Sequence, residues 1–358
     1  MLASNTQIIL LSVVLGIYYS IGRKQSEDLP VDENYAASVE SKVSQKLKNY
    51  YENSEFINVF NRKVFVKEVN TKNRQKCTVF IHGFPSSSAD FSQIFDDILE
   101  ENDGYALTFD FVGFGFSDKP KTGYFYGIHE HTDTLVEVLN QKLDGRKGCT
   151  FVSHDMGDTV LTELLARRHR NQLPGWFQNL GTEPLIKNVV FTNGGMFYKH
   201  IDKRITQILL ASNIGYIFDN LLRKLPYFFT AIIQQRQLSG IFSMHSREDE
   251  STKSFISDLA FLNKQWVDGS GATGSDLIQY LNDRAVYEYR WHNALSEIDI
   301  PCKLVWGDQD SVAPIEIAEG IVEISKGKCE LSYLEGVGHF WMVEKNWQDV
   351  KLVFEINN

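Results

Sequence analysis

Short apolar runs that end in polar or glycine residues recur along this chain, and they constrain its fold more than any other feature. Residues 78–81 (TVFI) are followed by a His-Gly pair, and residues 149–153 (CTFVS) by a His-Asp pair. Between such runs, residues 89–99 and 158–168 carry apolar side chains at helical spacing. Strands that alternate with helices in this way form a parallel sheet with helices on both faces. The sequence therefore predicts an α/β fold.

The remaining elements continue this alternation except in one segment. Further strands are expected at 64–69, 105–111, 187–192, 303–306 and 330–333, and further helices at 129–143, 315–324 and 347–356. Residues 196–298 have helical patterns without strands and predict a helical cap inserted into the core, which comprises residues 56–195 and 299–358. Ligands of such sheets bind beyond the carboxyl ends of the strands, so the cap is expected to cover that site.

The composition excludes several classes of protein. The 358 residues carry 36 basic and 46 acidic side chains, a net charge of −10, and no basic segment that would indicate a nucleic-acid partner. The four cysteines, Cys77, Cys149, Cys302 and Cys329, lack the C-x-x-C spacing of a zinc site and are too few for a disulfide scaffold. Three of them begin apolar runs. We therefore expect buried free thiols and a reducing compartment.

Residues 1–24 have the composition of a membrane anchor, and residues 25–55 that of a linker with a helical piece. The uncharged stretch at 7–21 would span roughly 22–24 Å as a helix, which suits the thin bilayer of the endoplasmic reticulum. Arg23 and Lys24 follow this stretch, which predicts a cytosolic body. A cleaved signal peptide is the alternative, although no basic residue precedes the apolar stretch.

Residues 151–158 (FVSHDMGD) show the pattern of a nucleophile elbow, in which a strand turns sharply into a helix. Asp155 stands at its centre, with the small residues Ser153 and Gly157 two positions away on either side. Ser153 does not fit as the nucleophile, because Phe151 and Asp155 would flank it. The alternative is an Asp that only caps a helix at a strand–helix junction.

Two further motifs lie at predicted strand ends. The sequence HGFP at 82–85 follows an early strand, and the backbone N–H groups of Phe84 and Met156 are candidates for an oxyanion hole. Late in the chain, Asp310 follows one strand and His339 the next, in the order nucleophile, acid, histidine. Asp308 is the alternative acid, but the spacing after Gly307 favours Asp310.

These motifs together resemble the α/β-hydrolases of the epoxide hydrolase and haloalkane dehalogenase branch. The segments 110–120 (DFVGFGFSDKP), 153–155 (SHD) and 193–195 (NGG) more closely resemble the mesoderm-specific transcript proteins, membrane-associated members of that branch. The resemblance covers residues 56–354. It implies an α/β-hydrolase fold with a helical cap.

The resemblance also implies a two-step reaction that needs no metal or other cofactor. Asp155 attacks an electrophilic carbon and forms an alkyl–enzyme ester. His339, held by Asp310, then activates a water that attacks this ester, while the Phe84 and Met156 amides hold the oxyanion. Epoxide opening also requires an acid, and cap tyrosines supply it in the family.

Tyr280, in the segment 277–282 (LIQYLN) behind a capping Ser275, is the candidate acid, and a core tyrosine is the alternative. Tyr198, Tyr216 and Tyr227 are candidates for a second one. Dehalogenation is disfavoured, because Met156 stands where those enzymes have a halide-binding Trp, and Phe84 where they have an Asn.

Two other patterns are interpreted as non-functional. The G-x-G-x-x-G match at 269–274 follows no strand, so a loop is expected instead of a dinucleotide site. His129 and His131 have no partner at metal-ligating spacing and are expected on a solvated helix face.

The leading hypothesis is a membrane-anchored, epoxide hydrolase-like enzyme with a hydrophobic or lipid-like substrate. A hydrolase or acyl-transfer enzyme acting on another lipid electrophile is the alternative within enzymes. A non-catalytic binding protein with the same fold is the alternative from another class.

Overall fold

The computed structural model describes residues 43–73, 76–143, 145–178, 184–197, 205–212, 214–217, 242–243, 246, 249–262 and 274–356. The predicted anchor at 7–21 and most of the predicted linker lie outside these ranges. Within them, no helix has the length and apolar composition needed to cross a membrane.

One eight-stranded sheet forms the centre of the molecule, in the order β1-β2-β4-β3-β5-β6-β7-β8. Strands β3 to β8 run parallel, as the alternation of strands and helices predicted, and β1 and β2 form an antiparallel hairpin at one edge. Strand β1 was not expected from the sequence. The bounds are β1 Glu55–Val59, β2 Arg62–Val69, β3 Cys77–Ile81, β4 Tyr105–Phe109, β5 Cys149–His154, β6 Ile186–Thr192, β7 Cys302–Gly307 and β8 Cys329–Leu334.

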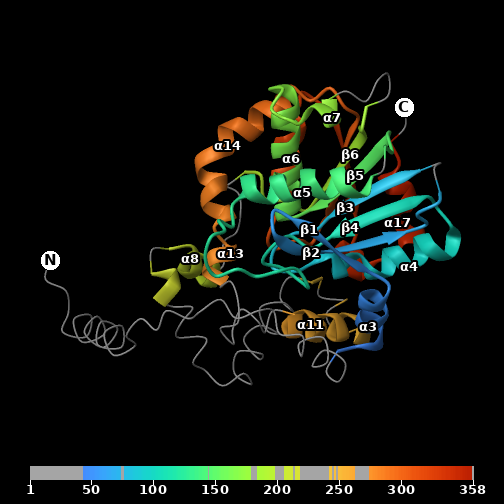
Figure 1. The fold of residues 1–358 in the computed structure, drawn as a ribbon. Coiled ribbons are helices and arrows are strands. Elements are labelled where there is room, and N and C mark those ends of the chain that lie inside the picture. The colour runs from blue at the N-terminus through green and yellow to red at the C-terminus, as the bar shows by residue number, and fades with distance from the viewer. Residues whose placement is uncertain are drawn as a thin grey trace, which may run out of the picture.

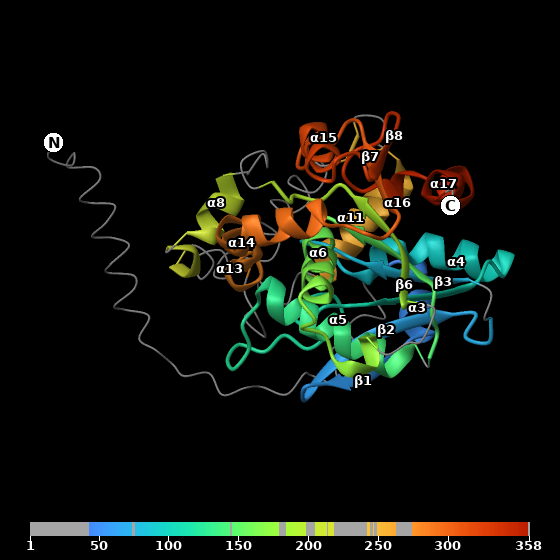
Figure 2. The same cartoon turned by 90° about the horizontal axis from the view of Figure 1, so that it is seen from above.

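Helices cover both faces of this sheet because its central strands are apolar on both sides (Figures 1 and 2). Val79 and Phe151 point into one core with α5 (Ile128–Lys142), α6 (Met156–His169) and α15 (Ile315–Ile324). Their neighbours Phe80 and Val152 point into a second core, with α4 (Ser92–Glu101) and α17 (Trp347–Phe354). Shorter elements are η1 Ser88–Phe91, α7 Gly175–Gln178 and α16 Trp341–Glu344.

Only helices are described in the segment predicted as the cap. They are α8 Ile205–Ala211, α11 Glu250–Leu262, α13 Gly274–Leu277 and α14 Tyr280–Ser296. Figure 1 shows α14 alongside α6, and α11 next to α3 (Gln45–Glu52), where Asp258 accepts hydrogen bonds from the backbone and side chain of Ser44. The segment 277–282 around Tyr280 is not one continuous helix, since α13 ends at Leu277 and α14 begins at Tyr280.

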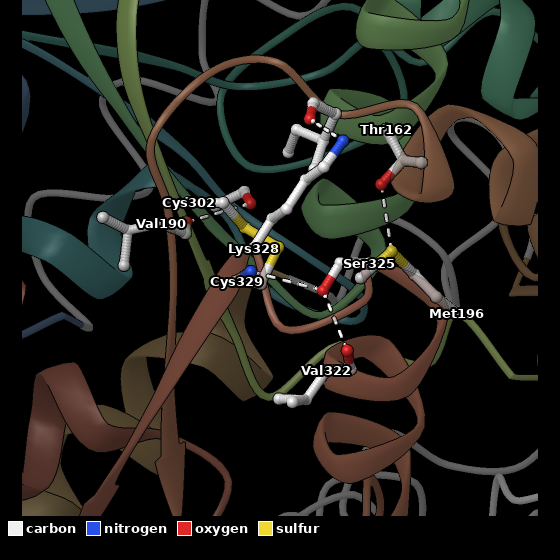
Figure 3. The surroundings of a disulfide bond; sticks show 10 residues. Thr162, Val190, Met196, Cys302, Val322, Ser325, Lys328 and Cys329 are labelled. Carbon is white, nitrogen blue, oxygen red and sulfur yellow. Dashed lines mark hydrogen bonds between the residues drawn. A yellow bond between two sulfur atoms is a disulfide. The ribbon is translucent and has the colours of Figure 1, made fainter.

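The expectation of four free thiols is wrong. Disulfides join Cys77 of β3 to Cys149 of β5, and Cys302 of β7 to Cys329 of β8. Figure 3 shows the second of these disulfides. Each pair consists of the first residues of two neighbouring parallel strands, which places the paired Cα atoms 4.5 Å apart, within the range that a disulfide can bridge. The cysteines therefore no longer support a reducing compartment.

Candidate active site

Asp155 occupies a strained turn between β5 and α6. Strand β5 ends at His154, α6 begins at Met156, and Asp155 between them has φ 50° and ψ −112°, where a non-glycine residue is uncommon. A Cβ atom on Gly157 would lie 2.6 Å from the carbonyl oxygen of Ile81, so the turn needs glycine there. The small residue two positions after Asp155 thus allows β3 and α6 to approach each other.

Two backbone amides converge on one oxygen of this carboxylate. The Phe84 N–H donates to Asp155 Oδ1 at 2.9 Å, and the Met156 N–H donates to the same oxygen. Phe84 follows β3 and Met156 opens α6, so both come from strand-to-helix connections at the carboxyl ends of parallel strands. The amino terminus of α6 adds its positive dipole end.

His339 faces the other oxygen of Asp155. Its Nε2 lies 3.7 Å from Asp155 Oδ2, while its Nδ1 lies 2.7 Å from Asp310 Oδ2. An imidazole that donates from Nδ1 to a carboxylate has Nε2 as its proton acceptor. The arrangement therefore presents a base next to the Asp155 carboxylate.

Asp310, and not Asp308, is the carboxylate that contacts His339. The backbone N–H groups of Val312 and Ala313 donate to Asp310 Oδ1 at 2.7 and 3.0 Å. Asp308 instead accepts hydrogen bonds from backbone N–H groups at the turn after β8. The two acids therefore differ in role, and Asp308 stabilises a turn.

Asn193, which lies just after β6, is a residue of the site to which the sequence motifs give no role. Its Nδ2 donates to Asp310 Oδ2 at 2.7 Å, and its Oδ1 accepts from the Gly307 N–H at 3.3 Å. Its position at the carboxyl end of a parallel strand was the available signal. Asn193 orients the carboxylate that holds His339.

The site is closed to solvent, with Asp155 4% and His339 1% exposed. Burial, with the nearby His339 as a lesser cause, lowers the pKa of His154 well below its usual value and leaves that ring neutral. Burial also raises the pKa of the Asp158 carboxyl group well above its usual value, which favours its neutral form. Burial therefore disfavours the charged form of both side chains.

Tyr280, the candidate acid, lies beside these residues. Its side chain is buried, and its ring centroid is 5.5 Å from that of Phe84. Burial raises the pKa of its phenol well above 10, and the neighbouring Asp155 raises it further. Of the candidates for a second tyrosine, Tyr216 is 61% exposed, and Tyr198 and Tyr227 lie outside the described residues.

A cavity of about 190 Å³ lies between α3, η1, α11 and α16, and none of Asp155, Asp310 and His339 lines it. No cluster of metal-ligating side chains occurs in the described ranges. The expectation of a solvated face for both histidines is wrong for His131, which is fully buried, and His129 contacts Glu163. Residues 269–273 of the glycine-rich match lie outside the described part of the chain.

Comparison with known proteins shows the family to which the chain belongs. The model of the family described as "Alpha/beta hydrolase family" matches residues 78–351. The mesoderm-specific transcript homolog protein of Bos taurus is 30% identical over 76% of this chain and 76% of its own length. LipZ of Mycobacterium tuberculosis, named provisionally as a hydrolase, is 30% identical over 74% of this chain and 83% of its own.

Solved structures share the fold. The epoxide hydrolase CorEH superposes with a TM-score of 0.61, at 15% identity, over 85% of this chain and 97% of its own. The resemblances derived from the motifs, both to the wider family and to the mesoderm-specific transcript proteins, are thereby confirmed.

Proposed function

Because the chain belongs to the alpha/beta hydrolase family, we propose that it is a hydrolase in which Asp155 is the nucleophile, His339 the base and Asp310 the acid that holds it. We propose an epoxide-opening reaction on a hydrophobic, lipid-like substrate. A carboxylate suits this chemistry, since it attacks a saturated carbon, whereas a serine attacks acyl carbonyls.

One observation carries the proposal. The Phe84 and Met156 amides both donate to Asp155 Oδ1, while the His339 Nε2 faces Oδ2. In the first step Oδ2 attacks the epoxide carbon, the carbon–oxygen bond breaks, and the resulting alkoxide takes a proton from Tyr280. The carbonyl oxygen of the new ester is then Oδ1, which the two amides already hold.

In the second step His339 removes a proton from water, and the hydroxide attacks the ester carbon of Asp155. Negative charge develops on Oδ1, where the two N–H groups stabilise it. Collapse of this intermediate releases the diol and restores the carboxylate. The His339 proton returns to the Tyr280 phenolate, so the net reaction is the addition of water to the epoxide.

The proposed substrate class rests on apolar surroundings and on the amino terminus. Aromatic rings of Phe84, Phe114, Tyr280 and Phe340 lie near the reacting groups and favour an apolar ligand. The apolar stretch at 7–21 supports membrane anchoring, and its length supports the endoplasmic reticulum membrane. A body on the cytosolic side rests on Arg23 and Lys24 alone.

The test uses the full-length His339→Gln variant in detergent, which lacks the base for the second step. We expect incubation with styrene oxide or decyloxirane to add one whole epoxide, and peptide mapping to place it on Asp155. The matched control is the same variant with Asp155→Asn, which should stay unmodified. Loss of a halide from bromododecane with no reaction of either epoxide would indicate a dehalogenase. A folded variant with no adduct from any of the three would contradict the proposal.

A further inference from the structure

Arg284 is a buried cation that joins the helix α14 to the turn carrying Asp155. It lies one helical turn after Tyr280 and is 1% exposed. Its Nη2 donates to the backbone carbonyl oxygen of Asp155 at 3.1 Å, and its Nε donates to Thr159 Oγ1 at 2.9 Å. One side chain thus holds both the strained turn and the first turn of α6.

The same guanidinium lies over the ring of Tyr280. Its Cζ is 4.8 Å from the ring centroid, a cation–π distance. Another neighbour of the ring is Phe84, which carries one of the two amides on Asp155. Among the described residues, the Tyr280 hydroxyl makes no hydrogen bond, so it is available to a substrate.

No Asp or Glu side chain among the described residues forms an ion pair with the buried Arg284 guanidinium. Burial raises the pKa of its acidic neighbour Asp158 well above the usual value, which disfavours a charged carboxylate there. Burying a cation without an ion-pair partner is unfavourable, so its place on the turn that carries Asp155 indicates function more than stability. The Arg284 charge opposes the effects of burial and of Asp155 on the pKa of the Tyr280 phenol.

We propose that Arg284 is a positioning residue that orients Tyr280 toward the substrate and balances the negative charge of the phenolate formed when Tyr280 protonates the opened epoxide. This inference rests on the proposed function. The proton passes from the Tyr280 hydroxyl to the epoxide oxygen as the carbon–oxygen bond breaks, and Arg284 itself gains and loses no proton. The ion pair between Arg284 and the Tyr280 phenolate lasts only until His339 passes its proton to the phenolate.

The experiment compares two electrophiles in the His339→Gln background. An epoxide oxygen needs a proton to leave, whereas the bromide of bromododecane does not. General acid catalysis contributes about 100-fold or more, so we expect Tyr280→Phe to slow adduct formation from decyloxirane by about 100-fold. Arg284→Gln should slow it by roughly tenfold, and either change should slow bromododecane by less than about threefold.

Three controls separate orientation and charge from folding. Arg284→Lys keeps the charge and should recover part of the epoxide rate. Arg168→Gln, which removes an arginine of α6 that pairs with Asp299 away from the site, should leave the ratio of the two rates unchanged. Combined with Tyr280→Phe, Arg284→Gln should cause little further loss, because the two residues act as a unit. Each variant is first shown to be folded by its thermal melting curve.

The outcomes distinguish the two proposals. Equal slowing of both electrophiles by Arg284→Gln, or full additivity with Tyr280→Phe, overturns the role of Arg284 but leaves the proposed function intact. If bromododecane does not react, the test rests on Arg284→Lys and on the double variant. Absence of rescue by lysine, or full additivity in the double variant, then overturns the role of Arg284. No adduct in the His339→Gln parent overturns the proposed function, and this inference with it.

Discussion

At the scale of single residues, the candidate site depends on hydrogen bonds that aim reactive groups. Asp310 accepts from the Val312 and Ala313 amides on one oxygen and contacts His339 and Asn193 on the other. A carboxylate with all its partners in place cannot rotate away from the imidazole. The base is therefore oriented by residues that never touch the substrate.

Asn193→Gly tests this orientation. Asn193 has φ 53°, which glycine adopts without strain, so the variant removes the amide and spares the backbone. We expect hydrolysis of the Asp155 ester to slow by about tenfold, the effect of about 1.4 kcal/mol of lost hydrogen bonding. Ester formation should change little, because His339 acts only in the second step. Rapid-quench mass spectrometry measures both rates, and equal slowing of both would contradict this role.

At the scale of elements, Glu163 ties three helices together behind the site. Its carboxylate lies in α6 and accepts from Arg290 and Trp291 of α14 at 2.7 and 2.9 Å, from Arg167 at 2.9 Å, and from His129 of α5 at 3.1 Å. Burial alone would raise the pKa of Glu163, but these hydrogen bonds outweigh it and lower the pKa. The cluster fixes α14, and with it Tyr280 and Arg284, against α6.

His129 makes this cluster sensitive to pH. Its hydrogen bond with Glu163 raises the pKa of the imidazole above 6.5. A group whose pKa is higher in the folded state contributes its full stabilisation at pH values below its unfolded-state pKa. This stabilisation is lost as the pH rises through the folded-state pKa. We expect His129→Gln to lower the free energy of unfolding by about 1 kcal/mol near pH 5.5 and by less near pH 9.

Guanidinium denaturation at the two pH values measures this difference. His292→Gln is the matched control, because burial lowers the pKa of His292 and should give the opposite dependence on pH. An equal loss of stability at both values in His129→Gln would show that the imidazole acts by packing alone.

At the scale of the whole molecule, the two disulfides join neighbouring strands at their amino-terminal ends. The candidate site lies at the opposite, carboxyl ends of the strands. The disulfides close segments separated by 72 and 27 residues in the chain. Disulfides persist in oxidising compartments, whereas the charge pattern after the apolar stretch predicts a cytosolic body. The disulfides and the charge pattern therefore predict different compartments for the body of the protein.

Reduction should destabilise the protein. We expect a reductant to lower the free energy of unfolding by about 2–4 kcal/mol for each disulfide. The double variant Cys77→Ser, Cys149→Ser lacks one disulfide, so its free energy of unfolding should be lower by this amount. Reductant should destabilise it further through the remaining disulfide. Thiol titration of the unfolded, unreduced chain should find no free thiol. Four reactive thiols there would contradict both disulfides and restore the expectation drawn from the sequence.

The sequence by itself determined the order of strands and helices, because apolar periodicity and turn residues are local properties. It also placed Asp155, Asp310 and His339 at strand ends, and parallel strands bring such ends to one edge of the sheet. For that reason the sequence alone groups these three residues, which lie far apart in the chain, into one site. The strained turn at Asp155 was visible as small residues on both sides.

Only the tertiary structure decided which side chains meet. Asn193 and Asp310 are 117 residues apart, and Arg284 and Asp155 are 129 apart, so no local pattern links them. The cysteine pairs likewise depend on which strands become neighbours and in what register. The sequence shows which residues can form strands and helices, whereas contacts between distant side chains follow from how those elements pack.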